Sequence, residues 1–298
     1  MGLQVSIARL GSGLAIATTL PLSKSLGSLS APILIGLMAL CIGFIAFIFY
    51  CTMDKKLDAS AGAEKANSGE DAFKVSDILA IAKNKGFWLI AILCVLFYSA
   101  VFPFLKFGTS LMINKFGMDE NWAGIIPAML PFGTVLLTPI FGNIYDKKGK
   151  GATIMLIGAA LLTFVHLLFS MQALNIWWIA AILMVLLGIA FSLVPSAMWP
   201  TVPKIIPQNQ LGTAYGMIFW VQNIGLSAVP FLIGWVLDKY CIVGERIGEK
   251  GNIIPLYDYT IPMMIFACFG VLAILVAFLL KREDGIKGYG IELPNMKK

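Results

Sequence analysis

The clearest candidate for chemistry is an arginine inside an apolar stretch near the start of the chain. Arg9 lies within Ser6–Ser12. A charge at membrane depth costs at least ~2.5–3.5 kcal/mol on insertion scales, so such residues usually face a cavity and a partner. A guanidinium group matches a carboxylate through two parallel hydrogen bonds. Arg9 is therefore a candidate for binding a substrate carboxylate. The alternative is an arginine whose side chain snorkels to the membrane surface.

An aromatic stripe on a later apolar stretch is the second candidate. Tyr98, Phe102 and Lys106 are four residues apart and share one face of a helix, and Pro103 permits a kink. Such a stripe could line a cavity, although aromatic stripes more often pack against other helices. Lys106 could equally lie near the outer end and reach water.

Two adjacent amides form the third candidate. Gln222 and Asn223 lie deep in another apolar stretch. A buried amide needs a hydrogen-bond partner, which here is another helix, water or a substrate. Substrate binding and contacts between helices both remain open for this pair.

A basic turn, Gly142–Lys150, joins two apolar stretches. Gly142 allows close approach of a neighbouring helix, and Gly149 permits a tight reversal. Asp146 could accept hydrogen bonds from the N-terminus of another helix, where negative charge is favourable. Lys150 and its basic neighbours would hold the turn at a membrane surface. The alternative is an ordinary basic loop.

Long apolar blocks must position all these residues. The chain has 298 residues, 59% hydrophobic and only 13% charged, whereas average soluble domains carry roughly 25% charged residues. Most blocks are about 20 residues long and lack period-two alternation, so we predict helices that cross a bilayer. The predicted fold is an all-α polytopic membrane protein with eight transmembrane helices. The blocks are Val5–Leu20, Ala31–Cys51, Phe87–Ile113, Trp122–Phe141, Ala152–Met171, Ile176–Met198, Ala214–Leu237 and Ile261–Leu280.

The placement of Lys and Arg predicts the orientation. With a cytoplasmic N-terminus and alternating loops, the cytoplasmic face holds about three times as many of these residues as the other face. The central loop, the Gly142–Lys150 turn and the C-terminus are therefore expected in the cytoplasm. This bias also explains the net charge of +6, so binding to nucleic acid is not expected.

The pattern Gly-x-x-x-Asp-x-x-Gly-Lys at Gly142–Lys150 resembles the signature turn of the major facilitator superfamily of transporters. The resemblance implies two six-helix halves that rock about a site at the membrane midplane. In that family the turn bridges the halves and is remade during transport. By the family's internal symmetry, Asp146 would meet the start of the first block near Gly2–Ser6.

This resemblance also divides the chain. Residues 53–85 are charged and then amphipathic over Phe73–Lys83, which suits a membrane surface. Two blocks precede this linker and six follow it, so we expect the chain to begin at the fifth of twelve helices. The alternative is an eight-helix protein complete in itself. The expected parts are residues 1–52 (the last two helices of the N-terminal half), 53–85 (a cytoplasmic linker), 86–281 (the six-helix C-terminal half) and 282–298 (a cytoplasmic tail).

A closer resemblance is to bacterial relatives of the lysosomal dipeptide uniporter. It rests on Ser-x-x-Arg-x-Gly-Ser around Arg9, on Tyr-Ser-x-x-Phe-Pro-Phe from Tyr98, and on Trp-Pro-x-Val-Pro from Trp199. Leu-Gly-Thr-Ala-Tyr-Gly and Gln-Asn-x-Gly follow in the same order, the latter beginning at Gln222. The resemblance implies that Arg9 anchors a substrate carboxylate, and that the helix of Tyr98 lines the central cavity.

The implied function is movement of dipeptides or similar amino-acid derivatives by facilitated diffusion. The expected partners are the lipid bilayer, a small-molecule substrate and the N-terminal helices of the same transporter. We expect the protein in the cell membrane, such as a bacterial inner membrane. The alternatives are a permease for another organic anion, a sugar or a drug, which could be proton-coupled, and a non-transporting membrane receptor or scaffold.

Patterns for catalysis, cofactors and metals are absent from the sequence. None of the five cysteines has metal-ligand or Cys-x-x-Cys spacing, and all are interpreted as packing residues. His166, the single histidine, lies in a block whose family counterpart is peripheral, so proton coupling through it is not expected. We therefore expect no enzyme activity, no cofactor and no metal.

Overall fold

The computed structural model describes residues 2–60, 75–247 and 253–296, without the side chains of residues 2–8, 58–60 and 75. Within these residues the chain is helical except for one two-stranded hairpin, a short 3-10 turn and the connecting segments. It divides into two compact units, residues 1–17 with 75–298 and residues 18–74. The predicted all-α polytopic fold is confirmed.

The smaller unit contains the end of α1 (Gly2–Ser25) and α2 (Ala31–Ser60). Gly27, with φ of 61°, turns the chain between them. An 18-residue window within residues 31–57 has a mean hydropathy of 2.7. A helix that is apolar all round is either core or a membrane span, and the length of α2 suits a span.

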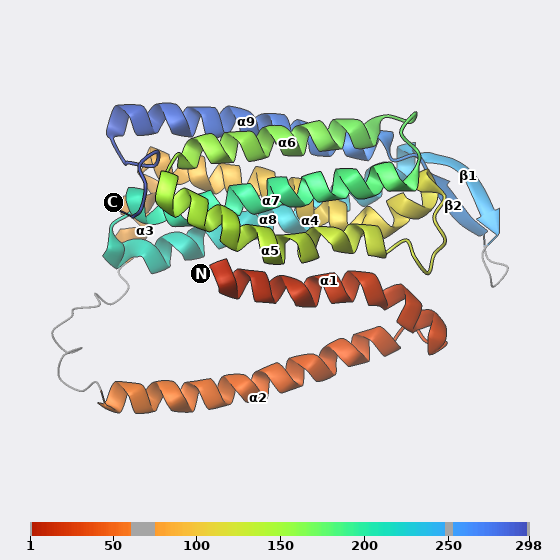
Figure 1. Cartoon of the computed structure of the whole chain (residues 1–298), viewed down its shortest axis with the longest axis horizontal. Helices are drawn as coiled ribbons and strands as arrows, with labels where there is room; N and C mark the ends of the chain where they lie inside the picture. Colours follow the sequence, from red (N-terminus) through yellow and green to blue (C-terminus); the bar gives the residue numbers. More distant parts are fainter. Residues whose placement is uncertain (1, 61–74, 248–252, 297–298) are drawn as a thin grey trace. The chain divides into compact units, whose positions relative to one another are not determined.

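The larger unit is built on six long helices that run side by side (Figure 1). Helix α6 packs against α7 and α9, α5 packs against α7, and α4 packs against α8 and α9. The short helix α3 (Val75–Ala82) packs against α4 and α8. The six helices are α4 (Lys85–Phe116), α5 (Ile125–Lys148), α6 (Gly151–Ser170), α7 (Trp177–Ile205), α8 (Leu211–Tyr240) and α9 (Thr260–Lys287).

Small residues let the first part of α1 approach α5 within this unit. A Cβ atom added at Gly13 would lie 3.0 Å from the ring of Phe132, and one added at Gly124 would lie 2.6 Å from the carbonyl oxygen of Ile16. Glycines at such contacts allow helices to pack closely. The contact places Arg9, two turns before Ile16, beside the bundle.

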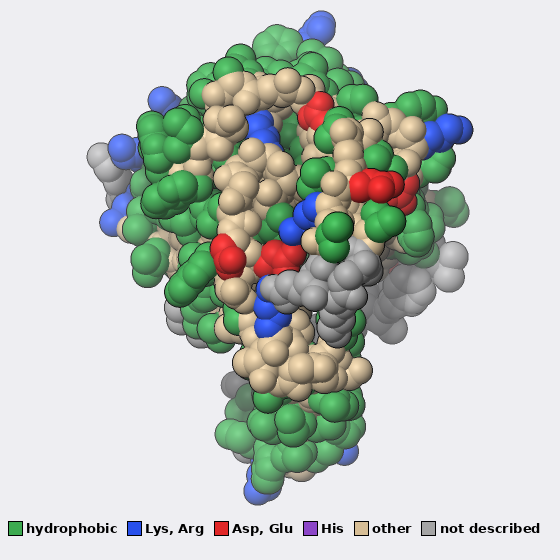
Figure 2. Space-filling view, turned by 90° about the vertical axis from the view of Figure 1, so that its right-hand side faces the viewer, with side chains coloured by type: hydrophobic (Ala, Val, Ile, Leu, Met, Phe, Trp, Pro, Cys, Tyr) green, Lys and Arg blue, Asp and Glu red, His purple; other side chains and the backbone are tan. Residues whose placement is uncertain are grey.

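A β-hairpin that the sequence analysis did not predict joins α8 to α9. β1 (Ile242–Ile247) pairs antiparallel with β2 (Ile253–Tyr257), with an irregularity after Ile242. The Arg246 guanidinium pairs with the Glu120 carboxylate at 2.7 Å, which ties β1 to the segment before α5. The hairpin lies at the opposite end of the bundle from the α5–α6 turn (Figure 1). Seen from the hairpin end, acidic and basic side chains are exposed on the end face and apolar side chains cover the flanks (Figure 2).

Seven of the described helices are long and apolar enough to cross a membrane: α2 and α4 to α9. This agrees with seven of the eight predicted spans. The eighth, α1, is a helix of 24 residues, of which residues 9–25 are described with their side chains. That α1 spans the membrane stays a prediction. The predicted amphipathic stretch Phe73–Lys83 is helical over α3, and its first two residues lie outside the described part of the chain.

Candidate functional site

A central cavity of about 900 Å³ lies within the larger unit, between α1, α4, α5, α7 and α8. Its walls are mostly aromatic and apolar, with a few polar groups, as is common for small-molecule sites. The lining residues are Arg9, Tyr98, Phe102, Thr138, Pro139, Gly142, Asn143, Asp146, Pro195, Ser196, Trp199, Pro200, Tyr215, Phe219, Gln222 and Leu226.

The cation of the cavity is held by aromatic rings. The guanidinium carbon of Arg9 lies 4.9 Å from the ring centres of both Phe102 and Phe191. These two rings are nearly perpendicular, at 87°, so they form a corner in which the guanidinium sits. In the described part of the chain, no acidic side chain forms an ion pair with Arg9. Its N–H donors are thus available to a group in the cavity.

The corner is rigid because its rings are packed from behind. Phe191 is buried and stacks on Phe97, with 6.0 Å between ring centres and 2° between planes. Tyr98 packs edge-on against Phe191 at 5.6 Å. The sequence analysis missed Phe191. A usable signal was its spacing of four and eight residues from Pro195 and Trp199, which places all three on one face of α7.

Trp199 links three helices around the cavity. Its Nε1–H donates to the Tyr98 hydroxyl on α4 at 3.0 Å, and its carbonyl oxygen accepts from the Tyr215 hydroxyl on α8 at 3.1 Å. The indole stacks on Phe219 with 4.9 Å between ring centres. Tyr215 and Phe219 were also missed as single residues, although their spacing of four puts them on one helical face.

The two predicted amides lie in different surroundings. Gln222 is buried, lines the cavity, and its Oε1 accepts from Cys94 Sγ at 3.1 Å. Asn223 is exposed and donates to the Phe219 carbonyl oxygen one turn earlier, at 2.9 Å. Lys106 is exposed and is not among the residues that line the cavity. The structure therefore brings together Arg9, Tyr98, Phe102, Trp199 and Gln222, and leaves out Asn223 and Lys106.

The predicted switch turn is divided in a similar way. Gly142 and Asp146 line the cavity, whereas Gly149 and Lys150 form the reversal beyond it. Both reversal residues have positive φ, 68° at Gly149 and 62° at Lys150. The predicted partner of Asp146 near Gly2–Ser6 lies outside the described residues, because the side chains of residues 2–8 are not described.

The last described segment, residues 288–296, lies across this turn; we call it the C-terminal strap. The Asn295 side chain donates to Asp146 Oδ1 at 2.8 Å. The Lys204 ammonium, on α7, donates to the carbonyl oxygens of Gly290 and Leu293 at 3.0 and 2.7 Å. The strap also carries Tyr289, whose pKa is raised by burial first and by the charge of Glu283 second.

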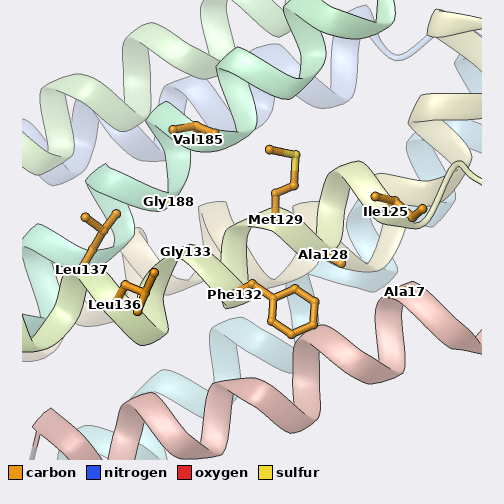
Figure 3. A pocket seen from close by; sticks show the side chains of 10 residues that line it. All are labelled: Ala17, Ile125, Ala128, Met129, Phe132, Gly133, Leu136, Leu137, Val185 and Gly188. Carbon is orange, nitrogen blue, oxygen red and sulfur yellow. The ribbon is translucent and has the colours of Figure 1, made fainter.

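A second, apolar cavity of about 400 Å³ lies between α1, α5 and α7 (Figure 3). Phe132 points toward α1 near Ala17, and Met129 points toward Val185 (Figure 3). Its lining offers no ionisable side chain.

His166 lies outside both cavities. It is fully buried, with the rings of Phe104 and Phe266 at 5.1 and 5.4 Å. This position agrees with a packing role.

The cavity is suited to binding rather than to covalent chemistry. It offers one cation, aromatic faces, hydroxyl and amide groups, and a carboxylate at the end nearest the turn. In the described ranges, no three His, Cys, Asp or Glu residues group closely enough to hold a metal ion. The arrangement can hold a small molecule that has an anionic group and an apolar or aromatic body.

Comparison with known proteins finds similarity to membrane transporters. The sequence profile of the Major Facilitator Superfamily matches residues 1–230. The lysosomal dipeptide transporter MFSD1 of Homo sapiens is 32% identical over 247 residues, which cover 80% of this chain and 52% of the relative. MFSD1 of Mus musculus is 29% identical over 295 residues, covering 95% and 59%. The multidrug resistance protein MdtG of Escherichia fergusonii is 28% identical over 158 residues, covering 51% and 37%. The chain spans about half the length of the curated relatives it matches.

Proposed function

This chain belongs to the Major Facilitator Superfamily of membrane transporters, and we propose that it moves a small zwitterionic solute, foremost a dipeptide, by alternating access. The observation that carries the proposal is Arg9 at the wall of the central cavity. It is the cation among the residues that line the cavity, and it is supported by rings rather than by an acidic partner. A carboxylate that enters the cavity would therefore find a guanidinium fork that pairs with no acidic side chain of the described residues.

The setting of Arg9 suits a carboxylate. Phe102 and Phe191 contact the guanidinium through cation–π interactions, each worth about 0.5–2 kcal/mol. They hold the group in place without consuming its N–H donors. Two parallel N–H···O bonds to a carboxylate then give orientation as well as affinity.

The aromatic walls suit the body of a peptide. Tyr98, Trp199, Tyr215 and Phe219 present ring faces to the cavity, and Gln222 and Ser196 add neutral polar groups. Such a surface tolerates different side chains because ring faces make few directional demands. Relatives named as dipeptide transporters support this substrate class.

We propose facilitated diffusion as the mode of transport. Among the lining residues the acidic side chain is Asp146, and it already accepts a hydrogen bond from Asn295. His166 is away from the cavity and surrounded by aromatic rings. A protonophore should therefore leave substrate equilibration across liposomes unchanged. Accumulation that collapses on adding the protonophore would contradict this mode.

A second candidate is a permease for apolar organic anions or drugs. The aromatic walls of the cavity and the relative named as a multidrug resistance protein favour it. Strong competition for transport by aromatic amphiphiles, without competition by dipeptides, would favour this second candidate.

The cavity residues and the α5–α6 turn form the substrate site and the conformational switch. The chain is a multi-pass membrane protein. We place the α5–α6 turn and the strap in the cytoplasm, which the Lys and Arg bias supports, and the protein in a cell membrane.

Competition by modified peptides tests the carboxylate role. In the whole protein reconstituted in liposomes, free-acid dipeptides should compete well and C-terminally amidated ones poorly. Losing a charge-assisted hydrogen bond is worth roughly 1.5–3 kcal/mol, or about one to two decades in affinity. Arg9→Lys should fail nearly as badly as Arg9→Ala, because an ammonium lacks the planar fork.

The matched control is Lys239→Ala, which removes a cation that also lies over aromatic rings, Trp235 and Tyr240, but outside the cavity. It should leave competition unchanged. Equal competition by free-acid and amidated peptides in the parent protein would refute the carboxylate role of Arg9.

A further inference from the structure

The C-terminal strap makes three hydrogen bonds to Asp146, the acidic residue among the described residues that line the central cavity. The Asn295 side chain donates to Asp146 Oδ1 at 2.8 Å. The backbone N–H groups of Asn295 and Met296 both donate to the carbonyl oxygen of Asp146 at 3.0 Å. The side-chain and main-chain positions of Asp146 are thus determined by the same two strap residues.

The rest of the strap is anchored independently of Asp146. The N–H groups of Lys150 and Gly151 donate to the carbonyl oxygens of Glu292 and Ile291, at 2.9 and 3.1 Å. The Glu292 carboxylate accepts from the N–H of Thr153 at 2.9 Å, in the first turn of α6. A carboxylate is favoured there by the helix dipole and by the unpaired N–H groups of a helix start.

Burial adds to these bonds. Ile291 is fully buried, and an added Cβ atom at Gly151 would lie 3.1 Å from its side chain and 2.8 Å from the ring of Tyr145. The strap is therefore a packed part of the turn. It carries Asn295, an exposed residue, to hydrogen-bond distance of Asp146.

We propose that Asn295 is a positioning residue that orients the Asp146 carboxylate at the end of the central cavity. The inference deepens the proposed function, because it concerns the switch turn of the same transport cycle. Asp146 Oδ1 accepts from the strap, so Oδ2 is the oxygen that would accept from a switch partner. A carboxylate already held in one rotamer loses less conformational entropy when the switch contact forms.

The test uses the whole protein with Asn295→Ala, which removes one donor and leaves the backbone bonds. The maximal transport rate of a dipeptide should fall about threefold or more, with KM within twofold, because the binding residues are untouched. Asn295→Ser keeps a donor and should recover at least half of the lost rate. Met296→Ala is the matched control, since the hydrogen bond of Met296 to Asp146 comes from its backbone N–H, and it should match the parent.

A second readout does not depend on the substrate. A cysteine introduced as Asn143→Cys, in a background without native cysteines, reports access to the cavity through its rate of alkylation. Asn295→Ala should change this rate at least threefold. If dipeptides are not transported at all, the proposed substrate is wrong, and the alkylation rate still decides the role of Asn295.

Asp146→Ala removes the acceptor of the Asn295 side chain and separates positioning from a purely structural role. If Asn295 acts through the Asp146 carboxylate, adding Asn295→Ala to Asp146→Ala should change neither transport nor alkylation further. Equal fold-changes in both backgrounds would overturn the proposal and make the strap a simple cap. An unchanged alkylation rate for Asn295→Ala in the parent would overturn it as well.

Discussion

The central cavity and the α5–α6 turn meet at Asp146, yet they are stabilised in different ways. Around Arg9 the contacts are ring faces, with 4.9 Å from the guanidinium carbon to each of two phenyl rings. Around the turn the contacts are backbone hydrogen bonds from the strap, and Lys150, Gly151 and Asp146 all take part.

The difference follows from what each region must do. A transport site has to exchange its contacts with substrate, and ring faces can do so at small cost because they are not directional. A turn that transmits motion must keep its shape, and directional backbone hydrogen bonds serve that end. The comparison predicts large effects on folding at the turn and smaller effects on affinity in the cavity.

The largest effect is expected at Gly149. With φ of 68°, an added Cβ atom would lie 2.5 Å from the Glu292 carbonyl oxygen. Gly149→Val combines backbone strain and overlap, each about 1–3 kcal/mol. We expect a loss of folded protein or a markedly lower melting temperature in detergent. The control, Gly212→Ala, meets no atom within 4 Å and should behave like the parent. A normal melting temperature for Gly149→Val would mean that the strap is not packed on the turn.

Ile291→Ala should have the next largest effect. The side chain is fully buried, and truncation of a buried isoleucine typically costs about 2–5 kcal/mol. We expect a value near the lower end, because a surface strap can settle into part of the space. Thermal unfolding and protease cleavage of the C-terminus measure it. Leu293→Ala, at a side chain that is 64% exposed, is the control. Equal melting temperatures for the two variants would contradict a packed strap.

Trp199→Phe tests the cavity side of the comparison. It keeps an aromatic face but removes the Nε1–H donor to Tyr98. One neutral hydrogen bond is worth about 0.5–1.5 kcal/mol, so substrate affinity should fall about three- to tenfold. Tyr98→Phe should add little in the Trp199→Phe background, because contacting residues are not additive. Fully additive losses in a binding assay would show that the two residues act separately.

The smallest effect is expected at Asn223. Its amide donates within its own helix and its side chain is exposed, and such surface substitutions usually stay within about 0.5 kcal/mol. Asn223→Leu should leave the melting temperature unchanged. It should change the dissociation constant of a dipeptide by less than about twofold. Gln222→Leu, one residue away and inside the cavity, should weaken binding and provides the comparison. A loss of binding in Asn223→Leu would place substrate on a face of α8 outside the cavity.

The sequence determined the membrane class, the helices and part of the site. Apolar blocks of about 20 residues predict helices in lipid, because a helix satisfies its own backbone hydrogen bonds. Seven of the eight predicted blocks are helices long and apolar enough to cross a membrane. Arg9, Tyr98, Phe102, Trp199 and Gln222 could be identified because polar or aromatic groups in apolar helices stand out, and the structure gathers all five around one cavity.

Only the tertiary structure decided which residues of a helix line the cavity and which segment is hydrogen-bonded to the α5–α6 turn. Gln222 and Asn223 are adjacent in sequence, but a helix rotates by 100° per residue, so one enters the cavity and the other leaves it. Phe191 looked like any apolar residue of a buried helix until its ring met Arg9. The strap lies about 140 residues from the turn that it covers, and its bonds to Asp146 run through backbone groups that every residue possesses. Backbone hydrogen bonds of this kind do not require a particular side chain, so the sequence cannot predict them and only the tertiary structure shows them.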